Sequence, residues 1–216
     1  MSMTYGIDLA GNNSLDSYDL NVTLTLRPVN ALKLILSGKY LDNHNELQYV
    51  TRRQNLSDDR YILGTIDQKN FGMTFRADLH ITPEFSVQYY GSPFLSRGKY
   101  SDFKYVIDPD NKSYNSRFEN YHNSVMINGK YMLDENNDLI SDYSINNPDF
   151  NFYQFRSNFV AKWEYRLGSF VYFVWSAERT ARMNSSDASL LKSYRQQRNV
   201  FPNNIFLIKL NYWFSV

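Results

Sequence analysis

The residues of this sequence that could do acid–base or metal chemistry are few and scattered. Its three histidines are His44, His80 and His122, and none has a partner at a spacing typical of a metal site. We therefore predict a polar structural role for His80. A Ser-His-Asp hydrolase site could be assembled from His122, Ser124 and a loop aspartate. Any protein with polar loops offers such triples, so a hydrolase is the least favoured function.

The acidic segment 134–138 (DENND) resembles the beginning of a calcium-binding loop. An EF-hand requires glycine at the sixth position and glutamate at the twelfth, where this chain has Leu139 and Ile145. We therefore predict a solvated loop tip at this segment. The sequence gives no other reason to expect a metal or a cofactor, and we expect neither.

Three aromatic residues, Tyr114, Phe118 and Tyr121, precede that acidic segment. Aromatic rings in an outer loop could stack on sugars, but they could equally pack hairpins against one another. We favour packing and keep sugar binding as the alternative.

The composition narrows the class of protein. The 216 residues carry a net charge of +1, contain no cysteine and are 17% aromatic. The charge is too small for a general nucleic-acid-binding surface, and a chain without cysteine has no disulfides or thiolate metal sites. Mean hydropathy is −0.53, which is polar for such an aromatic chain. A transmembrane β-barrel reconciles these values, because its strands alternate lipid-facing and lumen-facing residues.

Alternation of apolar and polar residues predicts an all-β, antiparallel, up-and-down barrel formed by one domain, residues 1–216. The alternation is clearest over residues 18–27, 71–81 and 153–165. It predicts about eight strands, at residues 3–12, 17–28, 31–53, 60–82, 84–106, 149–165, 168–180 and 203–215. Charged residues on the polar face, such as Lys39, Arg76 and Lys162, favour a hydrated lumen over a dry core. A water-soluble barrel with an aromatic core is the alternative that the period alone leaves open.

Loop lengths favour the membrane alternative. Connections near residues 28–30, 82–84 and 166–168 are short, and long outer hairpins are expected near 42–60, 97–149 and 181–202. Outer-membrane barrels have short periplasmic turns and long outer loops. An even strand number then places both termini on the periplasmic side.

The first 14 residues have neither the basic nor the apolar region of a signal peptide. The sequence contains no run of about 18 apolar residues, so we expect no transmembrane helix. An outer-membrane barrel needs a signal peptide, so either it was removed or the chain is the C-terminal portion of a larger barrel, and we favour the second explanation. The alternative is a complete cytosolic β-protein. The last predicted strand carries a pattern of the kind that the barrel-assembly machinery reads, at Phe206, Ile208, Leu210, Tyr212 and Phe214.

The stretch YYGSPFLSRGKYSDFKY, at residues 89–105, resembles a signature of the domain-of-unknown-function family 5916. Other stretches resemble that family too, at residues 149–169, 170–180 and 205–214. The resemblance implies the C-terminal barrel region of outer-membrane proteins that usually carry an N-terminal family 9 carbohydrate-binding-like domain. This chain has no room for that domain. The signature residues are Gly91, Ser92, Pro93, Phe94, Gly98, Lys99, Tyr100, Ser101, Asp102 and Phe103.

Two interpretations of the signature are open. Gly91, Pro93 and Gly98 could shape a long strand through a bend or bulge. Lys99, Asp102 and Lys104 could instead share a face and constrict a lumen. We favour the structural role.

Together these observations predict a non-enzymatic segment of an outer-membrane β-barrel in a Gram-negative bacterium. It would act as a pore, a translocation module or an anchor. Its expected partners are outer-membrane lipid and the barrel-assembly machinery, with no nucleic acid. The alternative is a surface-exposed module that binds a glycan or protein ligand through long extracellular hairpins.

Overall fold

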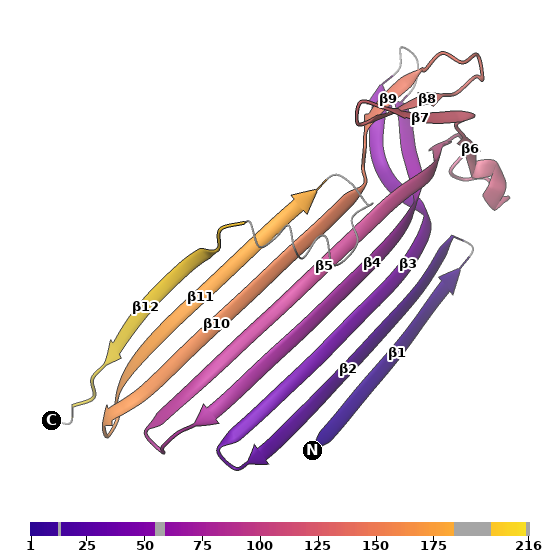
Figure 1. Cartoon of the computed structure of the whole chain (residues 1–216). Coiled ribbons are helices and arrows are strands. Elements are labelled where there is room, and N and C mark those ends of the chain that lie inside the picture. The colour runs from indigo at the N-terminus through magenta and orange to yellow at the C-terminus, as the bar shows by residue number, and fades with distance from the viewer. Residues whose placement is uncertain (13, 55–58, 184–199, 215–216) are drawn as a thin grey trace.

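The computed structural model describes residues 1–12, 14–54, 59–183 and 200–214. Its main feature is one long antiparallel sheet, in which eight strands follow the order β1-β2-β3-β4-β5-β10-β11-β12 (Figure 1). The strands are β1 (Ser2–Asn12), β2 (Leu15–Val29), β3 (Leu32–Gln54), β4 (Asp59–His80), β5 (Phe85–Val106), β10 (Phe150–Arg166), β11 (Ser169–Met183) and β12 (Asn203–Asn211). The predicted all-β, antiparallel, up-and-down arrangement is confirmed at this level.

The eight predicted strands all exist, with ends that differ by up to four residues. Alternating apolar and polar residues suit strands whose successive side chains point to opposite faces. The predicted turn at 28–30 begins later, because β2 continues to Val29 and the turn occupies Asn30 and Ala31. A register shift between Leu26 and Val29 accommodates Pro28 inside the strand. The turn after β10 contains Gly168 at φ +76°, a conformation that favours glycine.

The sheet is open rather than closed. Within the described residues, β1 pairs only with β2, and β12 pairs only with β11. Both termini and the three short turns lie at one end of the sheet, at the lower left of Figure 1. This end is called the turn end below.

A second unit lies at the opposite end, within the connection from β5 to β10. It contains a 3-10 helix η1 (Tyr114–Arg117), the short strand β6 (Phe118–Asn120) and a separate three-stranded sheet. The strands of that sheet are β7 (Asn123–Ile127), β8 (Lys130–Asp134) and β9 (Tyr143–Asn146). The sequence analysis predicted a long outer hairpin at 97–149 but missed these four strands.

The small sheet and the far ends of β3, β4 and β5 form one unit, which we call the cap: residues 48–54, 59–66 and 98–149. Its core is a cluster of nine buried residues, namely Ile62, Ile66, Tyr100, Phe103, Tyr105, Tyr121, Leu133, Tyr143 and Ile145. Residues 55–58 and most of the predicted hairpin 181–202 lie outside the described residues.

Candidate functional site

The register of the main sheet collects apolar residues on one face. One row of directly paired residues crosses seven strands, in the order Leu26, Leu34, Ala77, Tyr89, Phe159, Trp175 and Phe206. Residues directly opposite each other in antiparallel strands share a face. The same face contains every second residue of eight ranges, beginning with the first residue of each range. The ranges are 3–7, 20–26, 32–40, 71–79, 85–95, 153–163, 171–175 and 206–210. We call this set the apolar band.

Many large side chains of the apolar band are exposed, whereas Leu95 and Tyr153 within it are buried. Phe75, in the middle of the sheet, is 38% exposed, and Leu36, directly opposite it, is 43% exposed. At the two edges, Tyr5 is 75% exposed and Ile208 is 68% exposed. Contiguous exposed apolar surface of this extent is typical of an interaction with lipid or protein.

The height of the apolar band matches a bilayer. On β5 it runs from Phe85 to Leu95, which is ten steps along the strand. At about 3.3 Å per residue this is about 33 Å, and a strand tilt of about 40° reduces it to about 25 Å. Trp163 and Tyr165 lie exposed near the turn end. Aromatic residues at such a boundary are typical of barrel proteins.

Polar rows on the same face bound the apolar band toward the cap. The first row beyond Tyr40, Phe71 and Leu95 contains Asp42, Lys69 and Arg97. Lys69 Nζ lies 3.1 Å from Asp42 Oδ2. In the next row, His44 Nδ1 donates to Asp67 Oδ1 at 2.7 Å. The apolar face therefore ends abruptly in charged residues.

The opposite face of the main sheet is polar and is linked by hydrogen bonds. Lys39 Nζ lies 2.8 Å from Asp19 Oδ2, and Ser96 Oγ donates to Asn70 Oδ1 at 2.6 Å. Farther along, Gln154 Nε2 donates to Glu178 Oε1 at 2.8 Å. Long charged residues satisfied in this way suit a hydrated surface. We call this surface the polar face.

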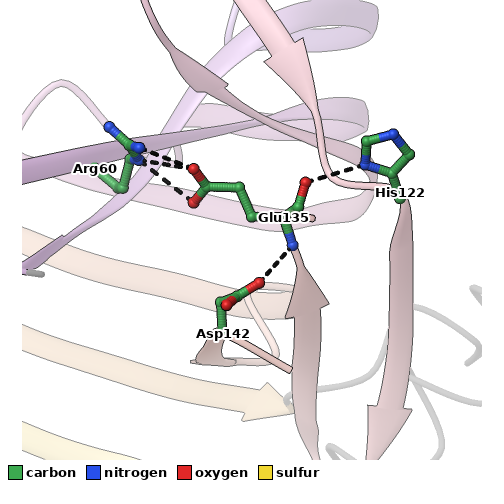
Figure 2. Close-up of polar contacts among 4 residues, drawn as sticks. All are labelled: Arg60, His122, Glu135 and Asp142. Carbon is green, nitrogen blue, oxygen red and sulfur yellow. Dashed lines mark hydrogen bonds and ion pairs between the residues drawn. The ribbon is translucent and has the colours of Figure 1, made fainter. Parts of the chain in front are cut away.

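Within the cap, the segment that carries the small sheet is held to the far end of β4 by a charge-assisted pair. The Arg60 guanidinium on β4 contacts both carboxylate oxygens of Glu135, with its Nη2 2.8 Å from Oε1 (Figure 2). The backbone N–H of Glu135 donates to Asp142 Oδ2 at 2.7 Å. His122 Nδ1 donates to the Glu135 carbonyl at 3.1 Å. A bidentate arginine–carboxylate pair fixes orientation as well as distance.

The cap chemistry resembles that of a water-soluble domain core. Burial, and then a hydrogen bond to Glu119, raise the pKa of the Tyr105 hydroxyl. Burial, and then the nearby Glu135, raise the pKa of Tyr121. Burial alone would raise the pKa of Asp134, but the backbone N–H groups of Leu139 and Asn137 outweigh it and lower that pKa. The pKa shifts of Tyr105, Tyr121 and Asp134 therefore result from burial and hydrogen bonding in and around the core of the cap.

The residues that the sequence offered for a hydrolase site are His122 and Ser124, and those that it offered for a metal loop are the segment 134–138. His122 donates to a backbone carbonyl, and the exposed Ser124 lies on β7. In the acidic segment, Asp134 accepts N–H bonds from Asn137 and Leu139. Across the described ranges, no group of three or more potential ligands from His, Cys, Asp and Glu could hold a metal ion. The core position of Tyr121, against Tyr105 and Tyr143, agrees with the packing interpretation.

The signature residues all lie on β5, but they do not shape it where the sequence suggested. Gly98 is required for close approach, because a Cβ there would collide with the ring of Phe150. The irregularity in β5 lies farther along the strand. Leu63 of β4 pairs with Lys104 and Thr65 pairs with Ser101, so the register between the two strands shifts at this point. Asp102, within that bulge, has φ +46°. The bulge expected at the glycines is thus displaced toward the cap.

Pro93 illustrates how a proline fits a central strand. Proline has no N–H, so it cannot donate to a neighbouring strand. Met73 lies opposite Pro93, between the pairs Gly72–Phe94 and Phe75–Gly91. The Met73 carbonyl instead accepts a hydrogen bond from the Ser92 hydroxyl at 3.0 Å. The Ser-Pro order therefore restores a donor that proline removes.

The remaining signature residues divide between core and surface. Tyr100 and Phe103 belong to the cap core, whereas Lys99 and Asp102 are exposed. All of these residues are described, and no ion pair joins Lys99, Asp102 and Lys104. The predicted charge network across a lumen stays a prediction.

The predicted assembly signal is only partly a strand. Phe206, Ile208 and Leu210 lie on β12, whereas Tyr212 and Phe214 follow its end at Asn211. The tail is tied to the turn after β10, because Trp213 N donates to Ser169 Oγ at 3.0 Å and Arg166 Nη1 donates to the Tyr212 hydroxyl at 3.0 Å. The predicted continuation to residue 215 is therefore wrong for residues 212–214, and residue 215 lies outside the described residues.

Comparison with models of known protein families, with curated proteins and with solved structures finds no match. The resemblance to the domain-of-unknown-function family 5916 stays a prediction. Among the described residues, no helix is long and apolar enough to cross a membrane.

Proposed function

We propose that this chain is a non-enzymatic segment of an outer-membrane β-barrel wall in a Gram-negative bacterium, which anchors the cap at the outer surface. The observation that carries the proposal is the apolar band, which has large exposed side chains on β1, β3, β4, β10, β11 and β12, while Leu95 and Tyr153 within it are buried. Its height of about 25 Å agrees with the apolar zone of outer-membrane barrels. The polar face would line the lumen, and β1 and β12 would be joined by pairing with each other or with further strands of a larger barrel.

The position of the cap favours anchoring among the three roles expected from the sequence. The cap lies at the end of the sheet opposite the short turns (Figure 1). In an outer-membrane barrel that end faces outward. A role as pore or translocation module depends on how many strands close the barrel, because an eight-stranded interior is filled by side chains.

A gel-mobility experiment tests the proposal. The chain is refolded in detergent and compared with and without boiling, with circular dichroism alongside. A boiling-dependent shift with β signal is expected if these residues close a barrel. Aggregation without a shift would assign them to a larger barrel, because an unpaired strand edge promotes association. A monodisperse β-protein that stays soluble without detergent would contradict the membrane assignment.

A second candidate function, capture of a glycan or protein ligand by the outer hairpins, is favoured by the surface of the cap. Val125 and Ile127 on β7 are 55% and 53% exposed, and Leu139 is 84% exposed. Within the described sheet, β7 pairs only with β8, so its other edge presents unpaired backbone groups. A screen of glycans and peptides against the folded chain, with Val125→Glu as the blocking variant, separates this candidate from simple anchoring.

A further inference from the structure

Three cations gather on the apolar-band face, where the band gives way to charged rows. Lys69 on β4 lies directly opposite Arg97 on β5, and Lys99 follows Arg97 by two residues on the same face. Directly opposed like charges destabilise a sheet unless a counter-charge is present. The arrangement therefore needs an explanation.

Neighbouring carboxylates neutralise only part of this cluster. Asp42 is within 3.1 Å of Lys69 Nζ and also accepts from the Tyr40 hydroxyl at 3.0 Å. Asp67, which is opposite Lys99, accepts from His44 instead. Arg97 and Lys99 form no ion pair with any carboxylate of the described residues. Two cations are left without a partner at the boundary of the band.

The surroundings on the band side are apolar. On the same face, the row next to Lys69 and Arg97 contains Phe71 and Leu95, which are directly paired. Phe71 is 41% exposed, whereas Leu95 is only 6% exposed, so the exposed apolar side chain that adjoins the cations is Phe71. A ligand that contacts both the cations and the apolar side chain beside them must have an anionic head and an apolar tail.

We propose that Lys69, Arg97 and Lys99 bind the phosphate of a membrane lipid headgroup, whose acyl chains lie over Phe71. This inference rests on the proposed function, because it requires the apolar band to face lipid. The level agrees with that assignment: headgroups lie at the boundary of the hydrocarbon zone. Arginine forms bidentate hydrogen bonds with phosphate, and lysine adds a point charge.

Native mass spectrometry of the refolded full chain in octyl glucoside, a detergent without phosphate, tests the site. Dioctanoyl phosphatidylglycerol is the probe, and dioctanoylglycerol and inorganic phosphate are the comparison ligands. The phosphatidylglycerol is expected to bind at least about fivefold more tightly than either, because each comparison ligand lacks one half of the interaction. Equal binding of inorganic phosphate would overturn the lipid assignment, and equal binding of the uncharged diacylglycerol would overturn the cationic site.

Variants then assign the binding to these residues. The double variant Arg97→Gln with Lys99→Gln is expected to lose the fivefold preference. The charge-retaining pair Arg97→Lys with Lys99→Arg is expected to keep most of it. The matched control is Lys33→Gln with Lys162→Gln, which removes two cations from the polar face and is expected to bind like the wild type. Equal preference in the first variant and the wild type would overturn the proposal.

Flotation with phosphatidylcholine vesicles keeps this inference separate from the proposed function. If the wild type inserts and shows the boiling-dependent shift but has no lipid preference, the phosphate site fails and the barrel assignment stands. If the wild type stays soluble and monodisperse without detergent and does not insert, the proposed function fails and the site fails with it.

Discussion

Two parts of the same strands treat their apolar residues in opposite ways. On β4, Ile62 in the cap is fully buried, whereas Phe71 in the apolar band is 41% exposed. On β5, Phe103 in the cap is 2% exposed, and Phe85 and Val87 in the apolar band are only partly buried. One continuous pair of strands thus runs from a closed core into an open apolar surface.

The two parts differ in whether the described residues themselves cover the apolar side chains. The cap has aromatic packing, such as Tyr105 against Tyr121 with ring centroids 5.1 Å apart, and a bidentate ion pair that closes it. It can therefore withdraw its apolar area from water by itself. The apolar band does not do so within the described residues. We propose lipid as its cover, and the following variants test the contrast.

The largest effect is expected from emptying the cap core. Phe103→Ala removes a ring that packs against Tyr131 at 4.7 Å between centroids. It should destabilise the cap by about 3–5 kcal/mol. Phe75→Ala in the apolar band should cost only about 1–2 kcal/mol, because lipid fills the space and only transfer free energy is lost.

Hydrogen exchange distinguishes the two variants. Phe103→Ala should lower the protection of amides in β9 while the boiling-dependent gel shift is retained. Phe75→Ala should leave β9 unchanged. If Phe103→Ala also abolished the gel shift, the cap and the band would be one cooperative unit, and the contrast between them would not hold.

An arginine placed on each face tests which side meets lipid. Leu36→Arg should destabilise the protein refolded in vesicles by about 2–4 kcal/mol, as expected for a cation at the bilayer midplane. Ser37→Arg, one residue along on the polar face, is the matched variant and should change stability by less than about 1 kcal/mol. Equilibrium urea unfolding monitored by tryptophan fluorescence gives both values. The reverse order would invert the two faces.

The ion pair of the cap should have an intermediate effect. The side chains of Arg60 and Glu135 are 26% and 19% exposed. Glu135→Gln removes the charge that faces Arg60 and should cost about 1–2 kcal/mol, more than a surface pair. The control is Asp59→Asn, whose partner Arg52 has a side chain that is 46% exposed, and it should cost under about 1 kcal/mol. Exchange of β8 amides measures both, and equal effects would mean that the pair does not hold the cap.

The sequence predicted the main sheet well because period-two alternation is a local signal. Tyr18, Leu20 and Val22 alternate with polar residues, and this alternation by itself shows that they share one face of the strand. Short turns then fix the register of each hairpin. The pattern could not reveal closure, because pairing of β1 with another strand depends on partners far away in the chain. It could not reveal lipid either, since an apolar face looks the same in a soluble barrel.

The short strands of the cap, β6 to β9, were missed because they give only a weak local signal. They are only three to five residues long, too short for a convincing period. Alternating Tyr131 and Leu133, and then Tyr143 and Ile145, were the available signal for two of them. Gly98 was recognised, but its role as a close approach to Phe150 depends on a residue from another strand. The bulge at Asp102 had no sequence signal of its own.

The smallest effect is expected from pH, at the charged rows above the apolar band. The hydrogen bond to Asp67 raises the pKa of His44 above its ordinary value of 6.5, against a smaller opposing effect of desolvation, and Asp67, Glu46 and Asp16 add attractive charge. A group with a raised pKa binds its proton more tightly in the folded state. Its contribution is therefore complete below about pH 6.5 and is lost as the pH rises through the folded pKa.

His44 has a side chain that is 44% exposed, so water screens most of this interaction. The wild type should lose only about 0.2–1 kcal/mol relative to His44→Gln between pH 5.5 and pH 8. Unfolding of both proteins across that range measures the difference. A wild type that gained stability over His44→Gln with rising pH would reverse the sign and mean that His44 is held neutral.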